Sequence, residues 1–264
     1  MSNSKNIREA VKDNYAKVAL ENSDFTGCGC GPEESCGPTD RDHDRVSSAM
    51  GYSQDELNAV PEGSNLGLGC GNPQAIASLQ PGETVLDLGS GAGFDAFLAV
   101  QRVGPSGTVY GVDMTPEMVS KARKNARTAG YDNVKFKLGQ IENLPVDDNS
   151  IDVIISNCVI NLSPEKQQVI NEAHRALKPG GRLAVSDVVA TAEMPASFME
   201  DLKLYSACVS GASTIASLEQ MLKNAGFQQI SITPKDESKS FIKDWVPDGK
   251  VEDYIVSASI QAVK

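Results

Sequence analysis

Short apolar runs and amphipathic stretches alternate along most of the chain. The apolar runs have the length of buried strands, and residues at helical spacing fill the stretches between them. This alternation is the pattern of βαβ units around a parallel sheet. It predicts an α/β fold with a mostly parallel, seven-stranded sheet, helices on both faces and an antiparallel last strand. The strands are expected at 84–88, 107–112, 134–138, 151–156, 182–187, 228–233 and 252–263.

Helices are expected where apolar residues recur every three or four positions, or where capping residues open a stretch. Ser53 and Glu56 have the spacing of a capping box, and Thr115 is an expected N-cap before Pro116. A later helix is expected to end at Lys178-Pro179-Gly180-Gly181. The helices are expected at 1–20, from Ser53, at 73–79, from Phe94, from Thr115, at 164–177 and at 217–224.

Two loops separate the first helices. Residues 22–45 are rich in glycine, proline, cysteine and charged residues, and 61–71 is rich in glycine, so both segments are expected to be irregular. The chain is therefore expected to consist of an N-terminal helical and cysteine-rich extension, 1–72, and a domain at 73–264. An insertion at 190–214 follows the fifth strand of that domain.

A glycine loop follows the first strand directly. Gly89, Gly91 and Gly93 allow a sharp turn and a close approach to a ligand, and Asp113 ends the second strand about twenty residues later. These features predict the nucleoside-binding half of an α/β sheet. A dinucleotide loop would carry its last glycine at the position of Phe94, so a pyrophosphate site is not predicted.

The spacing Asp87-x-Gly89-x-Gly91-x-Gly93 resembles the loop of class I S-adenosylmethionine-dependent methyltransferases, and the junction from Glu172 to Leu183 is similar to theirs. The resemblance implies a Rossmann-like fold and S-adenosyl-L-methionine as the cofactor. It implies cofactor contacts near the methionine for Asp87, Gly89, Ser90, Gly91 and Gly93, at the ribose for Asp113, around the adenine for Met114, Gln140, Ile141 and Glu142, and near the reactive centre for Asn157.

Each of these contacts has an alternative. Asp113 is also a suitable cap for the next helix, because aspartate is a favoured N-cap residue. Met114 and Ile141 are equally suited to a hydrophobic core, and Glu142 to a solvated loop.

Charge and segment composition narrow the partners. The net charge of −11 disfavours nucleic acids and anionic membrane surfaces, which bind clustered basic residues. No apolar run is long enough to cross a bilayer, and the first residues lack the apolar region of a signal peptide, so a cytoplasmic protein is expected. Six cysteines in a reducing compartment are expected to be thiols with a metal-binding or catalytic use.

Three of these cysteines are expected around one pocket. Cys158 follows the fourth strand directly, Cys208 lies in the insertion, and Cys70 lies in the glycine-rich loop before the first strand. Three thiols predict a soft, thiophilic methyl acceptor, and trivalent arsenic fits because thiolates bind soft ions and arsenite is neutral. The lone pair of a trithiolate arsenic can attack a methyl group without a general base, in keeping with a chain that has only two histidines.

The segments 65–73 and 156–162 and the sequence around Cys208 resemble arsenite methyltransferases. The resemblance implies that Cys70, Cys158 and Cys208 bind As(III), that residues 1–72 and the insertion cover the substrate, and that arsenic is methylated stepwise in detoxification. It further implies a thiol reductant, thioredoxin or a small thiol.

Such enzymes often have another N-terminal cysteine that forms a transient disulfide, and Cys28, Cys30 and Cys36 are the candidates here. Zinc binding by these cysteines together with His43 is an alternative. Two other functions stay open at this stage: methylation of a small organic acceptor such as a quinone or sterol precursor, and non-catalytic sensing of As(III).

Overall fold

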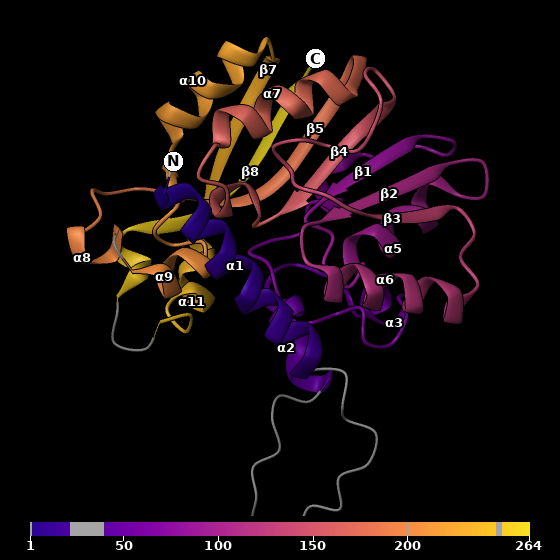
Figure 1. Ribbon diagram of the computed structural model, residues 1–264, viewed down its shortest axis with the longest axis horizontal. Helices are drawn as coiled ribbons and strands as arrows, with labels where there is room; N and C mark the ends of the chain where they lie inside the picture. The colour runs from indigo at the N-terminus through magenta and orange to yellow at the C-terminus, as the bar shows by residue number, and fades with distance from the viewer. Residues whose placement is uncertain (1, 22–39, 200, 247–249) are drawn as a thin grey trace, which may run out of the picture.

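A mixed sheet forms the centre of the molecule in the computed structural model, which describes residues 2–21, 40–199, 201–246 and 250–264 (Figure 1). The strand order is β3-β2-β1-β4-β5-β8-β7, with the short β6 paired to β5. β8 is antiparallel to both of its neighbours, as expected for the last strand. The strands are β1 Thr84–Leu88, β2 Thr108–Asp113, β3 Val134–Leu138, β4 Ile151–Asn157, β5 Leu177–Ala190, β6 Ser213–Thr214, β7 Gln228–Lys235 and β8 Ile255–Val263.

Helices cover both faces of this sheet (Figure 1). One face packs against α4, α5 and α6, and the other packs against α7 and α10. The helices are α1 Ser2–Glu21, α2 Asp40–Ala49, α3 Gln54–Asn58, α4 Gln74–Ala77, α5 Phe94–Val103, α6 Pro116–Ala129, α7 Lys166–Ala176, α8 Ala196–Met199, α9 Leu202–Ser206, α10 Ile215–Ala225 and α11 Lys239–Ile242. None of the described helices is long and apolar enough to span a bilayer.

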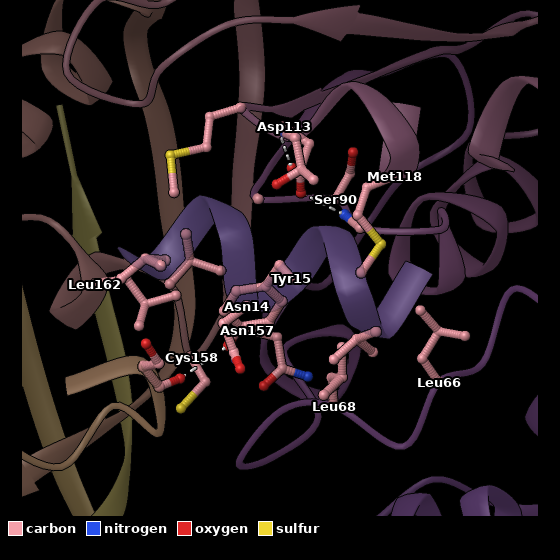
Figure 2. Close-up of a pocket in the computed structure, with 18 of the residues that line it drawn as sticks. Asn14, Tyr15, Leu66, Leu68, Ser90, Asp113, Met118, Asn157, Cys158 and Leu162 are labelled. Atoms are coloured by element: carbon pink, nitrogen blue, oxygen red, sulfur yellow. Dashed lines mark hydrogen bonds between the residues drawn. The ribbon is translucent and has the colours of Figure 1, made fainter. Parts of the chain in front are cut away.

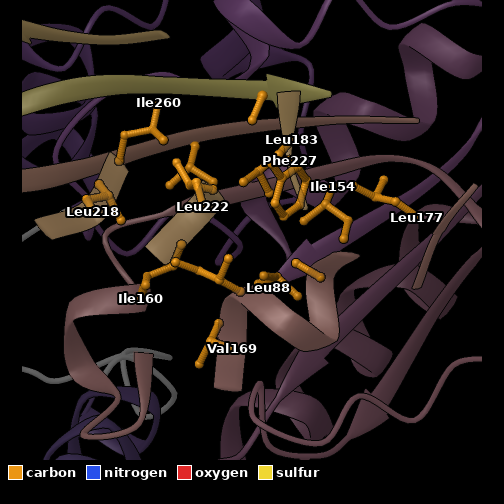
Figure 3. Packing of buried hydrophobic residues seen from close by; sticks show 14 of the residues in the cluster. Leu88, Ile154, Ile160, Val169, Leu177, Leu183, Leu218, Leu222, Phe227 and Ile260 are labelled. Carbon is orange, nitrogen blue, oxygen red and sulfur yellow. The ribbon is translucent and has the colours of Figure 1, made fainter. Parts of the chain in front are cut away.

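Aliphatic side chains fill the layer between the sheet and the pair α7 and α10 (Figure 3). Leu88 and Ile154 come from neighbouring central strands, while Val169 comes from α7 and Leu222 from α10. All four are almost fully buried. Each such side chain contributes roughly 1.5–3 kcal/mol on burial, so this layer holds the strand ends in fixed positions.

The chain order places a crevice at the carboxyl end of β1. β1 lies between β2 and β4, so the connections from it run in opposite directions across the sheet. Ligands of open α/β sheets bind at this kind of reversal. The register pairs Leu88 of β1 with Ser156 of β4, and Asn157 with Ser186 of β5. The loops that follow β1 and β4 therefore begin side by side, and β5 continues beside them to Ala190.

The strand and helix pattern predicted from the sequence is confirmed, with local differences. The short helices α8, α9 and α11 were not expected, and three other segments differ. Residues 40–45 were expected in a loop but belong to α2, where His43 and Ser47 are buried. The segment at Lys178–Gly181 lies within β5 as a bulge, because Ile151 pairs with Leu177 but Val153 pairs with Arg182. β6 adds a strand of two residues to the seven that were expected.

Candidate active site

A cavity of about 850 Å³ lies at the reversal point, between the strand ends and α1. This volume falls in the range of pockets that enclose a small molecule or cofactor. In Figure 2, Ser90 and Asp113 lie close together, and Cys158 lies apart from them toward the other side of the pocket. The cavity is lined by most of the residues that the sequence analysis named as site candidates: Asp87, Gly89, Ser90, Gly91, Asp113, Met114, Ile141, Glu142, Asn157, Cys158 and Cys208.

Three of the sequence candidates lie outside this lining. Gly93 has a φ of 100° and sits against the core: a Cβ there would lie 2.6 Å from a ring atom of Phe97 and 2.8 Å from one of Phe136. Its glycine is therefore required for packing. Gln140 is exposed and lines a second, smaller pocket beside α1. Cys70 lies just behind the cavity wall and is buried.

Two polar atoms in the cavity wall have no partner among the described residues. They are Oδ2 of Asp87 and Oγ of Ser90, both buried. Burial, followed by the charges of Asp95 and Asp113, raises the pKa of Asp87 well above its usual value. A buried polar atom without a partner costs free energy, so this corner of the cavity is suited to a ligand that brings hydrogen-bond donors or positive charge.

Asp113 shapes the glycine loop and the start of α6. Its Oδ2 accepts a hydrogen bond from the backbone N–H of Gly91 at 2.9 Å, and its Oδ1 accepts one from Thr115 at 2.8 Å. Asp113 is not the N-cap that was its alternative, because it bonds to the N–H of Thr115, which itself precedes the helix; its carboxylate also lines the cavity. The Thr115 side chain forms no cap hydrogen bond, although Thr115 occupies the predicted N-cap position. Burial raises the pKa of Asp113.

Glu142 is not a solvated loop charge. It is 9% exposed, and its Oε1 accepts hydrogen bonds from Ser163 at 2.6 Å and from Arg8 at 3.1 Å. Arg8 also reaches Glu165 at 2.7 Å. Glu142 thus joins α1 to the cavity wall.

Two of the predicted thiols, Cys70 and Cys158, lie close together beside one end of the cavity, and Cys208 lies next to Cys158. The Sγ atoms of Cys70 and Cys158 and a carboxylate oxygen of Asp187 lie within 4.8 Å of one another. The thiol of Cys208 donates a hydrogen bond to the carbonyl oxygen of Cys158, with an S···O distance of 2.9 Å. All three thiols are free and buried. Segments separated by 88 and 50 residues therefore supply one sulfur cluster.

The surroundings of Cys70 and Cys158 favour neutral thiols. Hydrogen bonds with the thiols of Cys208 and Cys70, followed by burial, raise the pKa of Cys158 well above its usual value. Burial likewise raises the pKa of Cys70. The sequence interpretation took thiolates as the binding form, but an apolar shell that includes Val11, Leu162 and Val188 disfavours the charge.

The backbone around the cluster is strained. Cys158 has a φ of 59° and Cys208 a φ of 62°, both in the left-handed region that non-glycine residues rarely adopt. Such conformations cost of order 1–3 kcal/mol and gather at functional sites. The backbone N–H of Cys158 donates to the carbonyl of Ser186 at 2.7 Å, which anchors this turn on the neighbouring strand.

Asn157 fixes the third cysteine. Its side-chain oxygen accepts a hydrogen bond from the backbone N–H of Cys70 at 3.0 Å, and its Nδ2 donates to the carbonyl of Gly71 at 2.8 Å. Ser257 donates to the carbonyl of Cys70 at 2.6 Å from the opposite side. Gly69 has a φ of 131°, and a Cβ there would lie 2.7 Å from the Asn157 side chain. Gly69 thus allows the loop to lie against Asn157, and Gly71 allows it to lie against Ser186.

Several lining residues escaped the sequence interpretation. Arg8 and Tyr15 come from α1, and Asp95 comes from the first turn of α5. Asp95 accepts a hydrogen bond from the hydroxyl of Tyr52 at 2.8 Å, and burial raises its pKa to about 6. An acid two residues after the last loop glycine was a visible signal for Asp95. The sequence holds no comparable signal for Tyr52.

One of the two histidines lies away from the cavity, and the three N-terminal cysteine candidates lie outside the described part of the chain. His174 packs its ring edge-on against Phe227, with ring centroids 5.1 Å apart. Cys28, Cys30 and Cys36 fall within residues 22–39, outside the described ranges, so the predictions made for them remain predictions.

Comparisons with known proteins identify the family to which the chain belongs. Residues 79–226 match a family model described as a methyltransferase domain. An arsenite methyltransferase from Halobacterium salinarum is 51% identical over 97% of this chain, and one from Aquipseudomonas alcaligenes is 39% identical over 86%. The chain spans 66% of the length of each of these relatives.

A solved structure of an arsenic methyltransferase is similar to this chain in both fold and sequence. The crystal structure of an arsenic (III) S-adenosylmethionine methyltransferase from Chlamydomonas reinhardtii superposes with a TM-score of 0.62 at 32% identity, covering 87% of this chain and 75% of that one. The class I methyltransferase fold expected from the glycine loop is thereby confirmed. On the sequence and structural matches together, the chain belongs to the arsenite methyltransferase family of class I methyltransferases.

Proposed function

We propose that this protein transfers methyl groups from S-adenosyl-L-methionine to trivalent arsenic held by Cys70, Cys158 and Cys208. The observation that carries the proposal is the meeting of three thiols from distant segments at one end of a cofactor-sized cavity. The names of the similar proteins support the same reaction.

The residues of the cavity fit S-adenosyl-L-methionine. The unpartnered oxygens of Asp87 and Ser90 suit the ammonium and other donors of the methionine part. Asp113 retains acceptor capacity for ribose hydroxyls, and Met114 and Ile141 offer apolar faces for the adenine, beside Glu142. When bound, the cofactor supplies an electrophilic methyl group. Gln140 and Gly93, which lie outside the cavity lining, are less suited to touch it than the other candidates.

The sulfur cluster fits neutral arsenite. Each thiol can replace one hydroxide: an As–S bond forms, an As–O bond breaks, and the thiol proton leaves with the hydroxide as water. This exchange conserves charge, so the raised thiol pKa values do not oppose it. The sulfurs then hold arsenic at the cavity end with its lone pair free, and alignment alone can contribute roughly 7–11 kcal/mol toward the barrier in favourable systems.

The described parts of the extension 1–72 and of the insertion 190–214 cover this reaction. Residues of α1 and of the segment around Cys208 line the cavity, where they limit the access of water to it. The products are methylated arsenicals, and the role of the reaction is arsenic detoxification. Thioredoxin or a small thiol acts as the reductant that returns the enzyme to its reduced state between turnovers. The sequence predicts a cytoplasmic location, which fractionation of expressing cells tests.

The direct test is to incubate the protein with arsenite, S-adenosyl-L-methionine and a thiol, and to speciate the arsenic. We expect methylated products from the native protein. Cys158→Ser and Cys208→Ser should each lower methylation at least a hundredfold, because two sulfurs cannot complete the trithiolate. Calorimetry should show cofactor affinity within about threefold of the native value, since the glycine loop and its acids are untouched.

Asp113→Ala is the reciprocal control. It should weaken cofactor binding while arsenite still binds the thiols, because Asp113 lies by the glycine loop and away from the sulfur cluster. Arsenite binding without methyl transfer in the native protein would favour the sensor hypothesis. Full turnover in either cysteine variant would contradict the proposal.

A further inference from the structure

Asp187 is a buried carboxylate directly beside the sulfur cluster. It lies near the carboxyl end of β5, is 2% exposed, and has an oxygen within 4.8 Å of the Sγ atoms of Cys70 and Cys158. The strand register explains the contact, because Asn157 of β4 pairs with Ser186 of β5. Cys158 and Asp187 are the next residues on these two strands.

The carboxylate of Asp187 is already saturated with donors. Oδ2 accepts hydrogen bonds from the backbone N–H groups of Ile160 at 3.0 Å and Asn161 at 3.4 Å. Oδ1 accepts from Asn161 Nδ2 at 2.9 Å and from the backbone N–H of Val188 at 2.8 Å. A carboxylate offers about four lone-pair positions, so these donors leave little capacity for a bond to arsenic or to a metal ion. Asp187 is therefore a fixed charge beside the cluster rather than one of its ligands.

The same donors keep the group ionised despite its burial. Burial raises the pKa of Asp187 to about 6, and hydrogen bonds from Val188, Asn161 and Ile160 limit the increase. Lys166 also favours the charged form, although burial lowers the pKa of Lys166 itself. Because four N–H groups donate to its two oxygens, the carboxylate is held in its ionised form, which only accepts, and the sulfur cluster thus faces a buried negative charge.

We propose that Asp187 stabilises the positive charge that develops on arsenic during methyl transfer. The inference rests on the proposed function. A trithiolate arsenic is neutral. Its lone pair forms the As–C bond as the donor S–C bond breaks, the bonding pair remains on the donor sulfur, and the positive charge passes to arsenic. A preorganised charge in a water-excluded site stabilises such a change without reorganisation, and in other enzymes one comparable group contributes roughly a hundred- to a thousandfold in rate.

A purely structural role makes different predictions. Asp187 also shapes the turn that carries Cys158, through Ile160 and Asn161. Asn161→Ala loosens the same turn, because it removes the side-chain hydrogen bonds to Asp187 and to the carbonyl of Val188, but it keeps the carboxylate. Asp187→Asn removes the charge, and Asp187→Glu keeps it.

The test measures two quantities in variants that bind S-adenosyl-L-methionine like the native protein. The first is the single-turnover rate of methyl transfer with arsenite already bound. We expect it to fall on the order of tenfold or more in Asp187→Asn, to recover at least partly in Asp187→Glu, and to stay within about threefold of native in Asn161→Ala. Arsenite affinity should change less than the rate in Asp187→Asn.

The second quantity needs no arsenite. Iodoacetamide labels thiols as thiolates, and mass spectrometry resolves the rates at Cys70 and Cys158. Because the anion opposes thiolate formation, Asp187→Asn should label several-fold faster, and Asp187→Glu should not.

Native transfer rates and unchanged labelling in Asp187→Asn would overturn the inference, as would an equal loss of transfer rate in Asn161→Ala. If Asp187→Asn does not bind the cofactor, the two charge-retaining variants decide: transfer close to native in both supports the inference, and a tenfold loss in Asn161→Ala overturns it. If the native protein does not methylate arsenite, the proposed function fails, and the labelling rates still report whether Asp187 acts on the thiols.

Discussion

At the scale of single residues, Asn157 joins the two halves of the candidate site. It lines the cavity, and its amide holds the backbone on both sides of the Cys70 side chain. Asn157→Ala should therefore displace Cys70 and lower arsenite affinity on the order of tenfold, since it leaves a backbone N–H and a carbonyl without partners. Cofactor affinity should fall less. Titrations with arsenite and with S-adenosyl-L-methionine measure both effects.

Tyr52→Phe is the matched control for this prediction. It removes a hydroxyl that bonds to Asp95 and accepts from Asn157, but it leaves the hydrogen bonds of Asn157 to Cys70 and Gly71 in place. Arsenite affinity should stay within about threefold of the native value. If Asn157→Ala weakens the cofactor more than arsenite, Asn157 is a cofactor contact rather than a support for Cys70.

The sequence could predict these residues only as far as local signals reach. Asp113 and Cys158 were predictable because each ends or directly follows a strand, and parallel strands bring such positions to one edge. Asp87 was predictable from its spacing to the glycine loop. The contact between Asn157 and Cys70 joins residues 87 positions apart in a loop without regular periodicity. Asp187 was missed because an acid at the end of a strand carries no local sign of the four donors that surround it.

At the scale of elements, α1 was predictable as a helix, but its position as one wall of the cavity was not. Its apolar spacing marks one face, on which Val11 is buried beside the thiols. The contacts that fix its position are formed by Arg8 with Glu142 and Glu165, and by Tyr15 with Ser206. These partners lie more than 130 residues away, and periodicity does not identify them. The α2 helix was missed for a related reason, because its polar composition resembles that of a loop.

The attachment of α1 leads to a prediction about ligand exchange. Arg8→Ala removes both ion pairs and leaves the carboxylate of Glu142 with Ser163 as its remaining side-chain donor among the described residues. The first half of α1 should then open more often. We expect cofactor affinity to fall by roughly two- to fivefold, mostly through faster dissociation, because partly exposed ion pairs are individually modest. Stopped-flow displacement of the bound cofactor measures the rate.

Lys5→Ala provides the control on the same helix. Lys5 pairs with Glu9 at 3.8 Å, and both side chains are largely exposed. Removing this pair changes the charge of α1 equally but touches neither Glu142 nor the main cavity. Dissociation should stay at the native rate. Equal acceleration in both variants would point to helix charge or helix propensity rather than to the Arg8 contacts.

At the scale of the whole molecule, the net charge of −11 follows from composition, but the positions of the acidic groups relative to the cavity follow only from the fold. Three acids, Asp87, Asp95 and Asp113, gather at one side of the cavity, where burial raises the pKa of each. The acidic composition disfavours negatively charged partners such as nucleic acids. It does not show that part of the negative charge is concentrated in a pocket that suits a cationic ligand.

This concentration of acids predicts how cofactor binding depends on pH. A carboxyl group whose pKa is raised by folding stabilises the folded protein when it is protonated. This contribution is complete below the pKa of the unfolded state, near 4, and is lost as the pH rises through the pKa of the folded state, which is about 6 for Asp95. S-adenosyl-L-methionine carries an ammonium and a sulfonium, so it favours the ionised acids and must displace protons at low pH. Its affinity should therefore rise about tenfold between about pH 5.5 and about pH 8. Calorimetry in buffers of different ionisation enthalpy measures the affinity and the protons released, and Asp95→Asn should reduce both dependences. An affinity that rises on acidification would show that these acids do not face the cofactor's positive charge.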